Sequence, residues 1–184
     1  MHPAEHRALR ELYAFTRQLE RHWASLAKLL AGDEAAALST GAKAAEAMLD
    51  ELAPLTGARG LPTATMARFA SHFATARPGA PDRLLERNQA LRFAALDAHH
   101  VATLLAYVAN LAAADGDDEL RSFCSRWERK LHTNERQVRL AAVAIGERPD
   151  EAIKPADGSL AGRAGAKVNS GIGAFGEWFD GRRS

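Results

Sequence analysis

The segment Asp97-Ala98-His99-His100 carries the residue types in this chain that are best suited to chemistry. Asp97 and His100 are three residues apart, and side chains at that spacing project together from one face of a helix. A carboxylate and an imidazole placed in this way can share a divalent metal ion. Glu20, Glu128 and Glu135 flank apolar repeats elsewhere in the chain and could converge on the same interior. These five residues are therefore the candidate metal ligands.

The same pair also has a structural interpretation. Asp97 and His100 fall on an apolar arc of a predicted helix, where a polar side chain without a partner costs free energy. A hydrogen bond between the two, or from either to Thr16 or Asn134, would satisfy them and fix the register of the packed helices. Haem ligation through His100 or His22 is a third alternative.

The helices that must position these residues are predicted from apolar residues at alternating spacings of three and four. Residues 4–31 form the first helix. Residues 34–53 form the second, which ends before Pro54 because proline disfavours the helical conformation in the preceding residue. Residues 82–114 form the third helix, and residues 118–146 form the fourth. Gly and Asp between the third and fourth helices are typical of a helix end followed by an N-cap, so the two helices should be antiparallel neighbours.

Each long helix has an apolar seam that should face the core. The seam of the first helix is Leu9, Leu12, Thr16, Leu19, Trp23, Leu26 and Leu30. The seam of the fourth is Leu120, Cys124, Trp127, Leu131, Asn134, Val138, Ala141 and Ile145. On the third helix the expected core arc is Phe93, Leu96, Leu104, Tyr107 and Leu111, with Asp97 and His100 inside it.

A short amphipathic helix over residues 63–76 should cross one side of the bundle. No sustained period-two alternation indicates a strand. The predicted fold class is all-α: an antiparallel up-down four-helix bundle with a short crossing helix between helices 2 and 3 and a C-terminal amphipathic, glycine-rich segment. Residues 1–148 form the predicted bundle domain, and residues 149–184 form a linker and tail.

The tail combines glycines with an apolar repeat. Seven of the 14 glycines lie between Gly158 and Gly181, yet large apolar residues still recur at helical spacing. Because glycine weakens a helix by about 1 kcal/mol relative to alanine, this helix needs a surface to form. It packs on the domain or on a sister chain in one interpretation. In the other, residues 159–181 contact a membrane surface or dock to a protein shell.

Composition excludes some partners. The formal charge is +1, from 24 basic and 23 acidic residues, so no overall field favours nucleic acid. Cys124 is the one cysteine, which rules out an intramolecular disulfide and agrees with a reducing compartment. The first residues lack the apolar stretch of a signal peptide, and we expect a cytoplasmic protein.

The predicted bundle resembles the ferritin-like family, whose di-iron members use a Glu from each of two helices and Glu-x-x-His from the other two. Asp97-x-x-His100 is similar to one such motif with Asp in place of Glu, and Glu20 matches a single-Glu ligand. A second Glu-x-x-His is missing, because His132 follows Glu128 by four residues. The resemblance covers residues 4–146 and implies iron or manganese as the cofactor.

Three functions remain open from the sequence. The first is a non-enzymatic interaction or structural module, forming a homodimer or binding a protein partner. The second is a ferritin-like metalloprotein in redox chemistry or metal storage. The third is a peripheral membrane or shell-docking protein that acts through residues 159–181.

Overall fold

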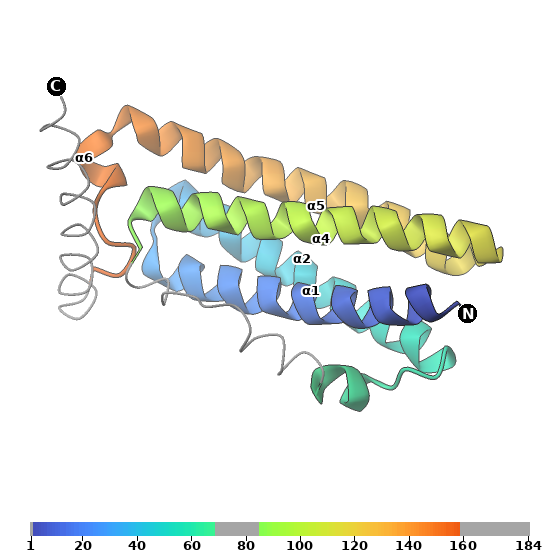
Figure 1. The fold of residues 1–184 in the computed structure, drawn as a ribbon. Coiled ribbons are helices and arrows are strands. Elements are labelled where there is room, and N and C mark those ends of the chain that lie inside the picture. The colour runs from blue at the N-terminus through green and yellow to red at the C-terminus, as the bar shows by residue number, and fades with distance from the viewer. Residues whose placement is uncertain (1, 69–84, 159–184) are drawn as a thin grey trace, which may run out of the picture.

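A computed structural model describes residues 2–68 and 85–158, and its regular elements are helices (Figure 1). Within these residues there is no strand, only an isolated antiparallel bridge between Glu86 and Pro155. The all-α prediction is therefore confirmed for this part of the chain. The elements are α1 (Pro3–Leu29), α2 (Gly32–Ala58), α4 (Arg87–Asp115), α5 (Asp118–Ala144), the 3-10 turn η2 (Ile145–Glu147) and α6 (Pro149–Ala152).

The four long helices lie side by side (Figure 1). Helix α1 packs against α2 and α4, and α5 packs against α4 and α2. Each long helix therefore has two long neighbours, and one continuous core runs between all four. Apolar side chains on the inner faces supply most of the driving force, at about 25 cal/mol for each Å² of apolar surface removed from water.

The predicted seams of α1 and α5 are confirmed. Every seam residue of α1, from Leu9 to Leu30, is buried. On α5 the large seam residues are buried as well, while Asn134 and Ala141 are partly exposed. Gly116 ends α4 in a left-handed conformation (φ 73°), and the Asp117 carboxylate accepts the Leu120 N–H at 3.0 Å as the N-cap of α5. The helix end and the N-cap predicted at this connection are both present.

The predicted core arc of α4 is wrong. Phe93, Leu96 and Tyr107 are 43%, 58% and 48% exposed, and of the five arc residues only Leu104 is buried. The face that packs inward is rotated by about one residue (~100°) and is rich in alanine. Its members are Ala90, Leu91, Ala94, Ala98, Val101, Ala102, Leu105, Val108, Ala109 and Ala112.

Small side chains on α4 let a large one approach from a neighbouring helix. The Trp23 indole of α1 is fully buried, and its Nε1–H donates to the Ala94 carbonyl at 3.1 Å. A bulky residue at position 94 would block this approach. The volume contributed by the neighbouring helix, and not the size of the residues on α4, therefore decides which face turns inward.

Helix α2 does not end before Pro54, as predicted, but continues to Ala58. Proline lacks one amide donor, and here its side chain lies on the exposed outer face, where water can reach the backbone. The extra turn buries Thr56, whose hydroxyl donates to the carbonyls of Leu52 and Ala53. Burial on one face thus outweighs the loss of one hydrogen bond on the other.

Helix α4 begins at Arg87 and not at residue 82. Glu86 is extended and forms a capping box, in which its N–H donates to Gln89 Oε1 at 3.3 Å. The chain before the helix pairs with residues 149–158: Arg87 N–H donates to the Lys154 carbonyl, and Ala156 N–H to the Leu85 carbonyl, both at 2.9 Å. This long-range pairing holds the chain extended at the point where the local pattern predicts helix.

The remaining sequence predictions fall partly outside the described residues. Residues 63–68 are helical, as predicted for the start of the crossing helix, and Leu61 and Met66 join the core. Residues 69–76 lie outside the described residues, as does the predicted tail helix over residues 159–181. Ala152 and Ala156 pack on the bundle, and the domain boundary at residue 148 stays a prediction. Among the described residues, no helix is long and apolar enough to span a bilayer.

Candidate functional site

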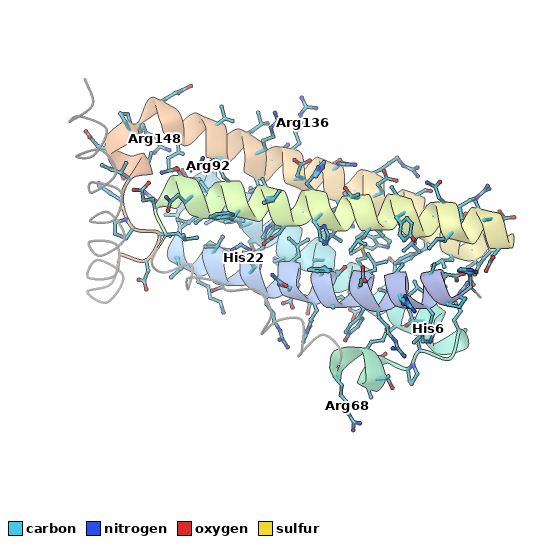
Figure 2. The ribbon with its side chains drawn as sticks, viewed as in Figure 1. His6, His22, Arg68, Arg92, Arg136 and Arg148 are labelled. Atoms are coloured by element: carbon cyan, nitrogen blue, oxygen red, sulfur yellow. The ribbon has the colours of Figure 1, made fainter. Side chains whose placement is uncertain are left out.

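Asp97 is paired across two helices, with His22 of α1. The distance from His22 Nδ1 to Asp97 Oδ2 is 2.7 Å, and both side chains are largely shielded from water. Figure 2 labels His22 on α1. His100, the predicted partner three residues further on, is exposed and makes an edge-on ring contact with Phe15 at 4.5 Å. The rotation of α4 explains both placements, because it turns Asp97 toward α1 and His100 toward solvent.

The three predicted glutamates lie at other places. Glu20 pairs with Arg17 one turn earlier on α1, at 3.3 Å. Glu128 and Glu135 flank His132 on α5, at 3.9 Å and 3.6 Å. Within residues 2–68 and 85–158, no three His, Cys, Asp or Glu side chains come together in a group that could hold a metal ion. The five candidate ligands are therefore not gathered at one point.

His22 is the site residue that the sequence analysis named only as an alternative haem ligand. The available signal was the position of His22 between two seam residues of α1. These residues, Leu19 and Trp23, are both fully buried. The histidine and its carboxylate are 75 positions apart in the chain. Local spacing cannot reveal such a pair, whereas the packing of α1 on α4 does.

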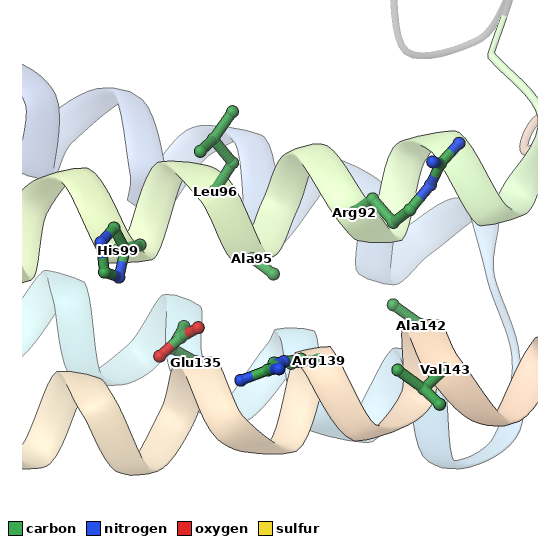
Figure 3. Close-up of a pocket in the computed structure, with 8 residues that line it drawn as sticks. All are labelled: Arg92, Ala95, Leu96, His99, Glu135, Arg139, Ala142 and Val143. Carbon is green, nitrogen blue, oxygen red and sulfur yellow. The ribbon is translucent and has the colours of Figure 1, made fainter.

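A groove opens on the surface between α4 and α5, with a volume of about 390 Å³. Figure 3 shows α4 residues on one side and α5 residues on the other. Two large apolar side chains line it from opposite sides: Leu96, and Val143, which is 68% exposed. We call this the α4–α5 groove, and its lining is Arg92, Ala95, Leu96, His99, Glu135, Arg139, Ala142 and Val143.

The charged groups of the α4–α5 groove have partners nearby. The Arg92 guanidinium donates to Asn88 Oδ1 at 2.9 Å. The Glu135 carboxylate lies 3.6 Å from His132, whose ring is 6.5 Å from that of His99. Side chains of both charges therefore lie beside the apolar residues that line the groove. Such a surface suits the contact of an amphipathic helix better than the binding of one charged small molecule.

A second groove of about 470 Å³ lies between α2 and α5, beside Glu51 and Phe123. The Arg126 guanidinium and the Trp127 indole N–H both donate to the Glu51 carboxylate, at 2.6 Å and 3.1 Å. The Arg126 hydrogen bond holds the pKa of Glu51 below its usual range. Lys130 lies 4.5 Å above the Trp127 ring. These contacts fasten α2 to α5, which is a structural role.

Comparisons with protein-family models, with curated proteins and with solved structures find no match for this chain. Functional inference therefore rests on the described geometry alone.

Proposed function

We propose that this chain is an antiparallel up-down four-helix bundle that acts as a non-enzymatic interaction module and associates with a second copy of itself. The connections support the topology. Two residues, Leu30 and Ala31, join α1 to α2, and Gly116 and Asp117 join α4 to α5. Connections this short favour antiparallel neighbours.

The observation that carries the proposal is an apolar stripe on the outer face of α4. Phe93, Leu96 and Tyr107 are each close to half exposed, at positions that recur at helical spacing. We call these three residues the α4 stripe. A helix of 29 residues that buries one apolar face and presents a second one to water has the pattern of a helix with a partner on both sides.

The charge of the molecule favours a second copy as that partner. With a formal charge of +1, two copies repel each other only weakly. The surface beside the stripe carries both signs, because Arg92 and Glu135 line the same groove as Leu96. In a two-fold symmetric contact the same surface meets itself, so neighbouring charges of opposite sign can pair across the interface.

Sedimentation velocity of the full chain tests the proposal. We expect the wild type to form a dimer, and Phe93→Glu to weaken self-association by about tenfold or more, since aromatic residues dominate such contacts. Leu140→Glu is the matched control. Leu140 is 54% exposed on α5, outside the stripe, and should leave the dimer intact. A wild type that stays monomeric at high concentration contradicts the proposal.

Elemental analysis separates this proposal from the ferritin-like alternative. Iron, manganese or zinc retained at a stoichiometric level, and lost in a His100→Ala variant, would favour the metalloprotein. The proposal expects the metal content to be unaffected by His100→Ala, because His100 is exposed and stacked edge-on against Phe15.

A further inference from the structure

The α4–α5 groove has a feature that self-association through the α4 stripe does not explain. Leu96 and Val143 line it from different helices, and Figure 3 shows Ala95 and Ala142 on the facing sides of α4 and α5. Small residues between two larger ones leave room for a helix to approach closely. The groove therefore has the shape and the apolar lining of a helix-docking surface.

The chain leaves the described structure close to this groove. Ala156 is buried and its N–H donates to the Leu85 carbonyl, two residues before α4 begins. The Asn88 amide donates to the Ala152 carbonyl at 2.9 Å, and Asn88 in turn accepts from Arg92, which lines the groove. Gly158 is exposed. The following residues thus start at the same end of the bundle as Arg92 and Val143.

Length and pattern suit the segment that follows. Residues 159–184 add 26 positions, and at 1.5 Å per residue a helix of this length spans about 39 Å, longer than the stretch of α4 from Arg92 to His99 that lines the groove. Its large apolar residues, together with Ala164 between Leu160 and Val168, recur three or four apart and so share one helical face. They are Leu160, Val168, Ile172, Phe175 and Phe179. Glycines between them would let the helix backbone approach Ala95 and Ala142 closely.

We propose that residues 159–181 dock as an amphipathic helix in the α4–α5 groove of the same chain. The groove provides the apolar surface that the glycine-rich segment needs to become helical. Docking of the segment in turn buries Leu96 and Val143, which are otherwise exposed. This docking covers Leu96, the one residue that the groove shares with the α4 stripe, and does not involve Phe93 or Tyr107. Phe93→Glu and Val143→Glu therefore test self-association and docking at separate residues.

Tryptophan fluorescence of the full chain provides a direct test. The chain has three tryptophans, and Trp23 and Trp127 are buried in the bundle. Quenching by acrylamide therefore reports chiefly on Trp178, with a Trp178→Phe chain as the baseline for the other two. We expect Trp178 to be shielded in the wild type. Trp178 quenched as readily in the wild type as in unfolded protein overturns the proposal.

Three variants test whether the shielding comes from the groove. Val143→Glu places a charge in the groove and should raise the quenching of Trp178 several-fold. Leu140→Glu makes the same change at a similarly exposed site on the same helix, outside the groove, and should leave quenching unchanged. Phe175→Asp changes the segment instead, and should match Val143→Glu. Circular dichroism confirms that each variant keeps its helices. Equal quenching in Val143→Glu and Leu140→Glu overturns the proposal.

Other occupants give different results. Shielding that is lost on dilution, together with loss of a sedimenting dimer, means that the segment docks on a second copy and overturns docking within one chain. Shielding that arises only on addition of vesicles of phosphatidylcholine and phosphatidylserine, with flotation of the protein, places the segment on a lipid surface and also overturns it. Shielding that is independent of concentration and of vesicles supports the proposal.

Discussion

The ring of Trp23 on α1 lies directly over the backbone of Gly41 on α2, and a β-carbon added at Gly41 would overlap that ring. The same indole donates its N–H to the Ala94 carbonyl of α4. Trp23 therefore joins three helices at one level of the core. A glycine on one side and an alanine on the other make the room for it.

Replacing Gly41 by alanine should destabilise the protein. Glycine inside a helix normally costs about 0.5–1 kcal/mol relative to alanine, so the substitution would help at an open site. Here Trp23 is fully buried and cannot move away, and overpacking of this kind costs about 1–3 kcal/mol. Urea unfolding should show a lower midpoint for Gly41→Ala.

Gly57, near the end of the same helix, is the matched control. A β-carbon there meets nothing within 4 Å. Gly57→Ala should leave the free energy of unfolding, measured in urea, unchanged or raise it by up to about 1 kcal/mol. A Gly41→Ala protein as stable as Gly57→Ala would show that Trp23 does not pack against α2 as described.

The contact between His22 and Asp97 should contribute to the free energy of unfolding. Asp97→Leu removes the carboxylate from a buried imidazole, and leaving such a group without this partner costs about 1–3 kcal/mol. His22→Leu with Asp97→Leu replaces both by apolar side chains, and should lose less than the sum of the two single variants. Urea unfolding of the four proteins gives this coupling energy. Strictly additive losses would mean that the two side chains do not interact.

Glu5 should make stability depend on pH in a defined direction. Burial, and then a hydrogen bond to the neighbouring Asp115, raise the pKa of Glu5 above its ordinary value of 4.5. The folded state therefore prefers the protonated acid. The stability that this preference contributes is fully present below the ordinary pKa and is lost as the pH rises through the raised pKa.

Glu5→Gln removes that loss, because the amide cannot ionise. The variant should be more stable than wild type at about pH 7.5, and the difference should shrink as the pH falls toward about 4.5. Urea midpoints across this range measure it. The exposed Glu46→Gln on α2 controls for the loss of one negative charge. A difference that grows toward low pH would contradict the assignment.

The sequence predicts α1 and α5 well because most of their large apolar residues lie on one buried face. Helix α4 is apolar on two faces. The large residues Phe93, Leu96 and Tyr107 lie on the exposed face, so their pattern predicts the wrong face as the buried one. The alanine face turns inward instead, where Trp23 of α1 donates to the Ala94 carbonyl. That rotation also decides the site, since it sends Asp97 to His22 and leaves His100 at the surface.

The errors at helix ends have a similar origin. The start of α4 depends on the pairing of Leu85 and Arg87 with residues 154–156, which lie about 70 positions further along the chain. The end of α2 depends on the burial of Thr56. Neither contact can be predicted from the spacing of residues along the chain, because both depend on which elements become neighbours in the folded chain.

Cys124 should be chemically inert in the folded protein. It lies fully buried on the α5 seam, and burial raises the pKa of its thiol to about 12. Since the thiolate is the reactive form, a disulfide reagent at about pH 8 should label Cys124 only as fast as the protein opens. Full labelling should follow on addition of denaturant.

A chain with Ser122→Cys and Cys124→Ala carries an exposed thiol two residues away on the same helix and should react at once. If native Cys124 reacts as quickly as that exposed thiol, α5 does not turn its seam inward, and the burial that underlies the fold, the groove and the α4 stripe is wrong.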